Sequence, residues 1–168
     1  MSAIERAKTR AVHRRPVADD ALEAFRAEVA KPDAQISLAG AALAVARYRY
    51  PDLDPGASLT MLEDFARPLG PRVAAAQTPR AAIREVNARL FRELSFQGNI
   101  HDYGDPRNSF LNLVLERRLG IPITLAIVYL EVAARAGFPL VPVGFPGHFL
   151  VKHVSPSGEI LLDPFNRG

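Results

Sequence analysis

The sequence has no cysteine and no tryptophan among its 168 residues. Without cysteine, the chain cannot form a disulfide, a thiolate metal site or a thiol nucleophile. It also lacks the run of ~18 apolar residues that a membrane-spanning helix needs. Residues 1–16 hold no apolar segment of the kind found in a secretory signal. We therefore expect no membrane association and a cytoplasmic location.

The basic residues are concentrated at the N-terminus. Residues 1–16 carry five basic residues and one acid, whereas the rest of the chain carries 16 basic and 17 acidic residues. A basic tail on a nearly neutral body is more typical of a disordered, solvated arm than of a nucleic-acid reader. We predict a tail over residues 1–18, one domain over residues 19–168, and no nucleic-acid partner. Binding through the tail would instead weaken steeply with salt and vanish without residues 1–16.

Helical periodicity dominates the first two thirds of the chain. The helices that we expect cover residues 19–30, 37–50, 58–77 in two pieces, 78–94, 108–118 and 122–136. Thr78 and Asn108 are the predicted N-caps of two of them. Pro122 suits a first helical turn, and the helix that follows it is apolar on nearly all sides, which predicts a central, buried position.

Three short β-rich segments follow the last helix. They cover residues 140–144, 148–154 and 159–163, and turns rich in glycine, proline and serine separate them. Residues 95–108 form a long polar loop between two helices. The sequence therefore predicts an α+β fold, in which a helical N-terminal two thirds packs on a small antiparallel sheet.

A histidine and an aspartate fall on adjacent predicted strands. If the loop 155–158 pairs Val154 with Glu159, then Asp163 lies one diagonal step from His148 on the same face of the sheet. A loop one residue longer or shorter would reverse this parity. A carboxylate on one imidazole nitrogen leaves the other nitrogen as a base. The alternative is a half-buried pair with a structural role.

Metal binding has weak support in the sequence. His153 falls on the opposite strand face from His148, so these two histidines are not expected to share a metal. His101 and Asp102 in the polar loop are a minor alternative. We expect no metal and no cofactor.

Four blocks of the sequence carry a family resemblance. They are FQGN (96–99), DPRNSFLNLVLERRLGIPITL (105–125), GFPGHFLV (144–151) and LLDPFN (161–166). They resemble the N-terminal domain of SirB-type proteins, of the transglutaminase-like superfamily, whose core resembles papain. The likeness extends over about residues 20–168. The resemblance leaves open whether the chain is a fragment of a longer protein or a short member.

This resemblance implies a Cys–His–Asp triad, with His148 and Asp163 at the matching histidine and aspartate positions. The cysteine should open the buried helix, near residues 122–124, where a helix N-terminus helps to hold a thiolate. The chain has Pro-Ile-Thr there and no cysteine anywhere.

Two functions follow from this incomplete triad. The first is a non-catalytic module that binds an unidentified protein or peptide in the superfamily's cleft. The second is a hydrolase or acyltransferase in which His148 and Asp163 activate a hydroxyl, with Thr124 as the candidate nucleophile and Ser109 as a weaker one. The Thr124 hydroxyl could instead bond back to the helix backbone. We favour binding.

The candidate binding residues come from the polar loop and from the turn before His148. Tyr103 is the candidate recognition aromatic, with a packed loop anchor as the alternative, and the two asparagines could order the loop through backbone hydrogen bonds. Gly147 is expected to set a tight turn that orients His148. The full set is Asn99, Tyr103, Asn108, Ser109, Phe145 and Gly147.

Overall fold

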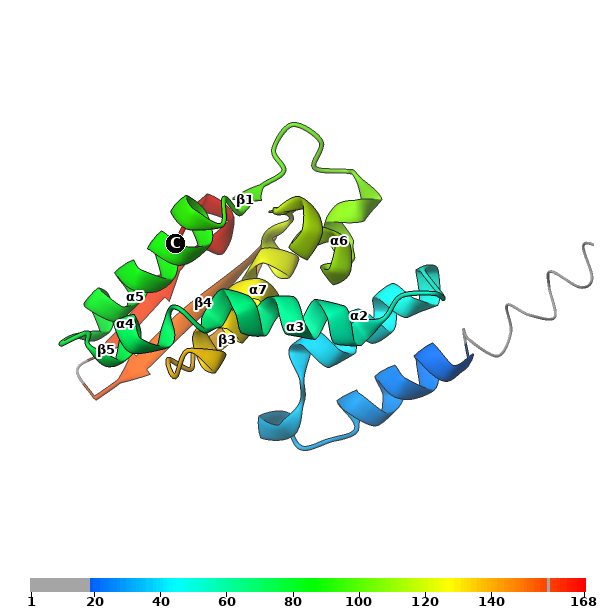
Figure 1. Cartoon of the computed structure of the whole chain (residues 1–168), viewed down its shortest axis with the longest axis horizontal. Helices are drawn as coiled ribbons and strands as arrows, with labels where there is room; N and C mark the ends of the chain where they lie inside the picture. The colour runs from blue at the N-terminus through cyan, green and yellow to red at the C-terminus, as the bar shows by residue number, and fades with distance from the viewer. Residues whose placement is uncertain (1–18, 157) are drawn as a thin grey trace, which may run out of the picture. The chain divides into compact units, whose positions relative to one another are not determined.

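The computed structural model describes residues 19–156 and 158–168 (Figure 1). The chain divides into two compact units, Met1–Pro55 and Gly56–Gly168. The basic tail predicted over residues 1–18 lies outside the described residues. Within the described part, no helix is both long enough and apolar enough to cross a membrane.

The first unit contains two helices joined through a cap. Residues 19–29 are helical, η1 spans Asp33–Gln35, and α2 spans Leu38–Arg49. The Ser37 hydroxyl accepts a hydrogen bond from the Gly40 N–H at 2.9 Å, which satisfies a free donor at the start of α2. The Ser37 N–H donates to the Glu28 carboxylate at 2.6 Å and so ties the first helix to the second. The helices predicted over residues 19–30 and 37–50 are confirmed.

The second unit contains most of the helical turns. They are α3 (Pro55–Ala66, starting at the unit boundary), α4 (Gly70–Ala74), α5 (Pro79–Asn87), η2 (Ala88–Glu93), η3 (Pro106–Ser109), α6 (Leu111–Arg117), α7 (Pro122–Arg135) and η4 (Pro164–Asn166). The break predicted within residues 58–77 is present between α3 and α4. Thr78 caps α5 as predicted, since its hydroxyl accepts from the Ala81 N–H at 3.2 Å.

Helix α5 widens into a π turn over η2. The Leu94 N–H donates to the Arg89 carbonyl at 3.0 Å, an i→i+5 bond. In a regular α-helix, Phe91 would lie on the same side of the helix as Arg84, because two α-turns take about seven residues. The wider turn takes one more residue, so Arg92 lies on that side, and the Phe91 ring packs 6.0 Å from the Tyr129 ring.

The prediction that Asn108 caps the next helix is wrong. Asn108 lies inside the 3-10 turn η3, and α6 begins at Leu111 with Phe110 at the cap position. The Asn108 amide instead donates to the Asp102 carbonyl at 2.9 Å, so the polar loop uses the side chain that a helix cap would need.

The main sheet has three antiparallel strands in the order β3-β4-β5. They are β3 (Val141–Phe145), β4 (His148–Ser155) and β5 (Gly158–Leu162), and a short parallel pair joins β1 (Gln97–Gly98) to β2 (Leu119–Gly120). Val154 pairs with Glu159, which confirms the predicted register. Figure 1 shows α7 packed along β4, so this helix covers one face of the sheet. The α+β fold class is confirmed.

Helix α7 is the centre of the second unit, as its apolar sequence predicts. Ile123, near its start, is an exception, with 45% of its surface exposed, and Ala134 near its end is exposed as well. The helix buries Pro122, Thr124, Leu125, Ala126, Val128, Tyr129, Leu130, Val132 and Ala133. Each buried leucine or valine contributes about 1.5–3 kcal/mol relative to an exposed side chain, so this helix carries much of the core's stability.

Arg118 ends α6 in a left-handed conformation, with φ of 62°. Its guanidinium lies 4.2 Å from the centre of the Phe65 ring and 5.0 Å from that of Phe96, and burial lowers its pKa. The two rings meet edge to face at 5.9 Å. The cation therefore joins the end of α6 to α3 and to the segment before β1.

Replacing Gly120 by alanine tests the close approach of β2 to α7. A Cβ there would lie 2.8 Å from the Thr124 hydroxyl oxygen and 3.1 Å from Leu125 Cγ. We expect Gly120→Ala to lower the free energy of unfolding by about 1–3 kcal/mol, measured by urea denaturation. Gly70→Ala is the control, because no atom lies within 4 Å of its Cβ position. Equal urea midpoints for the two variants would show that the approach is not tight.

Candidate functional site

His148 and Asp163 are hydrogen-bonded at one end of the sheet. His148 begins β4, and Asp163 follows the last residue of β5. The Nε2 atom of His148 lies 2.8 Å from Oδ2 of Asp163, with both side chains about a quarter exposed. The register that pairs Val154 with Glu159 places the two residues on one face, so the sequence-based prediction of their proximity is confirmed.

Asp163 is held by the turn that follows it. Its Oδ1 accepts from the backbone N–H groups of Phe165 and Asn166, at 3.1 and 3.3 Å, and its Oδ2 accepts from the Asn166 side chain at 2.7 Å. Partial burial raises the pKa of the Asp163 carboxyl, but the hydrogen bonds from Asn166 and His148 outweigh it, so the pKa lies below its ordinary value. An ionised carboxylate can only accept, so His148 donates from Nε2 and its Nδ1 is the free nitrogen.

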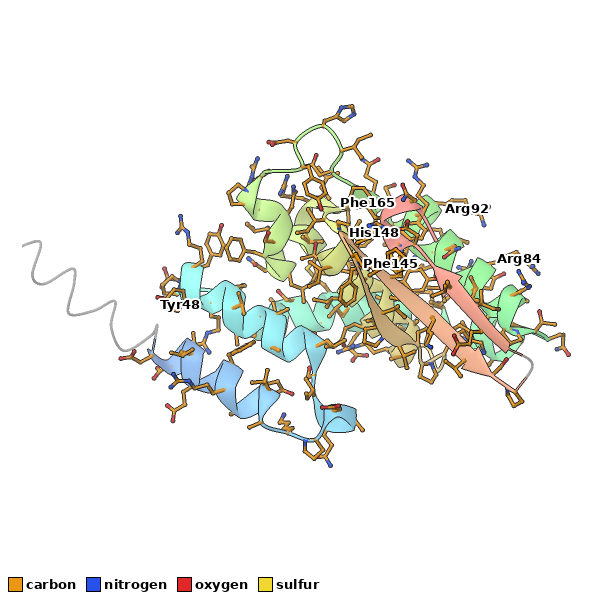
Figure 2. All side chains as sticks on the ribbon, turned by 180° about the vertical axis from the view of Figure 1, so that it is seen from behind. Tyr48, Arg84, Arg92, Phe145, His148 and Phe165 are labelled. Atoms are coloured by element: carbon orange, nitrogen blue, oxygen red, sulfur yellow. The ribbon has the colours of Figure 1, made fainter. Side chains whose placement is uncertain are left out.

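Phe165 fixes the surroundings of this pair. Its ring meets the His148 ring edge to face at 6.2 Å and the Tyr103 ring at 6.0 Å. A Cβ on Gly98 would lie 2.5 Å from the Phe165 ring, so β1 leaves room for the aromatic only because glycine stands there. Figure 2 shows Phe165, His148 and Phe145 gathered at the same end of the sheet. Phe165 is not among the site residues predicted from the sequence, although it lies two residues after Asp163 in the block LLDPFN.

A tight turn joins β3 to β4 immediately before His148. Phe145 pairs with His148 across the turn, and Gly147 has φ of +72°, a conformation that favours glycine. Proline before such a glycine is typical of a type II turn, and here it is Pro146. The turn leaves Phe145 60% exposed beside the histidine. The predicted geometry of Gly147 is therefore present.

A cavity of about 200 Å³ adjoins His148. Apart from His148 and the Tyr103 hydroxyl, the side chains that line it offer only carbon. Its lining residues are Tyr103, Ile121, Pro122, Ile123, Gly147, His148 and Phe149. Carbon atoms of the first turn of α7 thus lie where the family resemblance would place a cysteine.

The Thr124 hydroxyl is used inside the fold. Thr124 is 4% exposed, and its Oγ1 donates to the Asn108 carbonyl at 2.8 Å while accepting from the Ile121 N–H at 3.1 Å. Among the described residues, no hydrogen bond joins it to His148, and it does not line the cavity. Ser109 is exposed at the end of η3 and also lies outside the lining. The structure therefore brings neither candidate hydroxyl into the cavity beside His148.

The two candidate asparagines hold the loop from within. Asn99 and Asn108 are buried, and the Asn99 amide donates to the Asn108 side-chain oxygen at 3.0 Å. Nearby, Asp105 accepts from Arg107 and from Arg117 at 2.9 Å, and the hydrogen bond from Arg107 lowers the pKa of Asp105 to about 2. The loop built this way carries Tyr103, 55% exposed, to the edge of the cavity.

His101 and His153 do not assemble with other metal ligands in the described part of the chain. The His153 ring stacks on Phe138 at 4.8 Å, on the other face of β4 from His148. Over residues 19–156 and 158–168, no group of three histidine, aspartate or glutamate side chains is arranged to hold a metal ion.

Comparison with known proteins gives one family match. Residues 57–168 match the family model of the transglutaminase-like superfamily, a range that begins with the second unit. No solved structure matches the chain.

Several curated proteins are similar in sequence. A UPF0162 protein of Xylella fastidiosa is 44% identical over 136 residues, which cover 81% of this chain and 48% of that protein. A UPF0162 protein of Pseudomonas aeruginosa is 39% identical over 127 residues, 74% of this chain and 45% of the relative. F-box only protein 21 of Mus musculus is 42% identical over 81 residues, 48% of this chain and 13% of the mouse protein. The chain spans about half the length of the UPF0162 relatives.

Gly98→Ala tests the support behind His148. The added methyl group must displace the Phe165 ring, so we expect a loss of about 1–3 kcal/mol in unfolding free energy and a changed NMR shift of the His148 ring nitrogens. Gly104→Ala is the control, because nothing lies within 4 Å of its Cβ position. Unchanged His148 shifts in Gly98→Ala would contradict the role given to Phe165.

Asn166→Ala tests the hydrogen bonds to Asp163. Removing the amide should raise the pKa of Asp163, measured from the ¹³C shift of its carboxyl carbon. A carboxyl with a lowered pKa in the folded state stabilises the fold above its unfolded value of about 3.9, and this contribution is lost as pH falls through the folded value. As the pH falls from the unfolded pKa through the folded pKa of Asp163, the free energy of unfolding should therefore drop less in the variant than in the parent chain. An unchanged Asp163 titration would refute the assignment.

Proposed function

Because the chain belongs to the transglutaminase-like superfamily, we propose that its second unit is a non-catalytic module that binds a protein or peptide at the His148 cavity. The carbon lining contributed by Pro122 and Ile123 carries the proposal, together with the absence of cysteine from the sequence. The start of α7 offers this base no side-chain hydroxyl or thiol at the position where the superfamily's nucleophile would lie. We further propose that the module is of the SirB type and works in the cytoplasm.

The cavity suits one apolar side chain of an extended segment. Its volume is about 200 Å³, and the exposed side chains of Tyr103 and Ile123 line it. Phe145, also exposed, pairs with His148 beside it. Such side chains often supply most of the energy at a protein interface. His148 Nδ1 and the Tyr103 hydroxyl could hydrogen-bond to the backbone of the bound segment and fix its direction.

The hydroxyl chemistry considered from the sequence has no support in this geometry. The Thr124 oxygen donates one hydrogen bond and accepts another within the loop and the helix start. An activated hydroxyl must donate to the base, and the single proton of Thr124 is already donated to the Asn108 carbonyl. The Asp163 carboxylate in this proposal keeps the imidazole in one orientation for binding.

The proposed binding function belongs to the domain matched over residues 57–168. Since the UPF0162 relatives extend well beyond the matched residues, activities of the complete relatives are outside it. The match to F-box only protein 21 covers a still smaller share of that protein.

A selection from a phage-displayed random peptide library tests the binding site. We expect the enriched peptides to carry an apolar residue. Their affinity for the Ile123→Glu variant should be at least about tenfold weaker than for the parent chain, since burying a charge in an apolar cavity is costly. Val154→Glu is the matched control, because Val154 is exposed at the far end of β4. The affinity of the enriched peptides for Val154→Glu should stay within about twofold of their affinity for the parent chain.

Two results would overturn the proposal. One is a set of enriched peptides that bind both variants equally well, or no enrichment at all. The other is hydrolysis of activated esters or peptides by the parent chain that disappears in His148→Ala. Circular dichroism of each variant shows whether the fold is retained.

A further inference from the structure

A row of arginines follows the exposed side of α5 and η2. Arg80, Arg84 and Arg92 are all exposed. Figure 2 shows Arg84 and Arg92 projecting from the same side of this helix. The π turn produces this alignment, because it uses one additional residue between them and turns Phe91 toward Tyr129.

The acids of the same helix do not neutralise this row. Glu85 binds Arg72 at 2.7 Å, and Glu93 binds Arg72 at 2.7 Å and Arg89 at 3.0 Å. These contacts hold α4 against α5 and lower the pKa of Glu93. Within the described part of the chain, the row itself forms no ion pair with any carboxylate.

A fourth exposed arginine belongs to the segment that contacts this helix. Arg167 follows η4, and the next residue, Gly168, lies so close to the Asn87 amide that a Cβ on it would clash. Asn87 stands between Arg84 and Arg92 along the helix. We call Arg80, Arg84, Arg92 and Arg167 the arginine row.

An apolar cavity lies at the N-terminal end of the arginine row. It measures about 330 Å³ and is lined by Val73, Ala74, Ala76, Gln77, Thr78, Pro79, Ala82, Ala136, Gly137 and Phe138. Thr78 and Pro79 also line a second hollow, which includes Arg80 and Ser155. Ser155 ends β4 and His148 begins it, so this surface is at the opposite end of the strand from the His148 cavity.

We infer that the arginine row and the adjoining cavity bind an acidic segment of a protein partner that carries an apolar side chain. Guanidinium groups pair with carboxylates through two parallel hydrogen bonds, and an uncompensated row of them attracts successive acidic side chains. The apolar side chain would enter the cavity beside Arg80. Single-stranded nucleic acid fits less well, because base stacking needs exposed aromatics and Phe91 is turned inward. This surface is separate from the proposed peptide site.

Fluorescence anisotropy of the full chain tests the inference. The probe is a fluorescein-labelled oligo-glutamate peptide with a leucine at its centre, and an all-glutamate peptide is the reference. We expect Arg84→Glu with Arg92→Glu to weaken binding of the leucine peptide at least about tenfold, because two attractive charges become repulsive. Arg26→Glu with Arg67→Glu is the control of equal net charge, expected to stay within about threefold, since both residues are exposed elsewhere on the chain.

Further variants separate the parts of the surface. Ala76→Phe, which fills the apolar cavity, should abolish the preference for the leucine peptide over the all-glutamate peptide. Ile123→Glu should bind the probe like the parent, so failure of the His148 site and failure of this surface remain distinguishable. Three results would each overturn the inference. They are an equal loss of affinity in the two double arginine variants, no binding of the leucine peptide at low salt, and tighter binding of an oligo-uridine RNA than of that peptide.

Discussion

The Asp163 carboxylate is the contact on which the His148 end of the second unit depends. It accepts hydrogen bonds from two backbone N–H groups and one side-chain amide of the turn η4, and a further hydrogen bond from the imidazole of His148. The turn places Phe165 between His148 and Tyr103, and Gly98 leaves room for it. One charged group thereby fixes the strand end, the histidine and the approach of the polar loop.

The start of α7 shows why a familiar arrangement of residues need not keep its chemistry. Thr124 holds the loop through the Asn108 carbonyl and also satisfies the Ile121 N–H, both inside the protein. Pro122 and Ile123 meanwhile present carbon to the cavity. The first turn of this helix therefore stabilises a loop and shapes a surface, and it presents no hydroxyl or thiol to the histidine beside it.

Periodic features of the molecule could be predicted from sequence, whereas close packing could not. Alternation along the strands and the hairpin register placed His148 beside Asp163, because side chains alternate with a period of two. The α+β class, the cap at Thr78 and the buried α7 follow from equally local rules. The cap predicted at Asn108 was wrong, because asparagine satisfies loop carbonyls as readily as helix donors. Phe165 escaped notice since its position depends on space left by a distant glycine.

The π turn at η2 has a consequence for reading the helix as a pattern. It acts as a one-residue phase shift, so the residues of α5 and the last residues of η2 follow two different helical frames. An amphipathic stripe drawn through α5 with a constant period would place Phe91 outside and Arg92 closer to the core. Because the wide turn takes up one extra residue, loss of a single residue within it would restore a regular helix and leave the entry to β1 on its present side. The chain can therefore lose one residue in this short segment without rotating the elements that follow it, whereas the same loss within the regular helix α7 would turn the residues beyond it by about one hundred degrees.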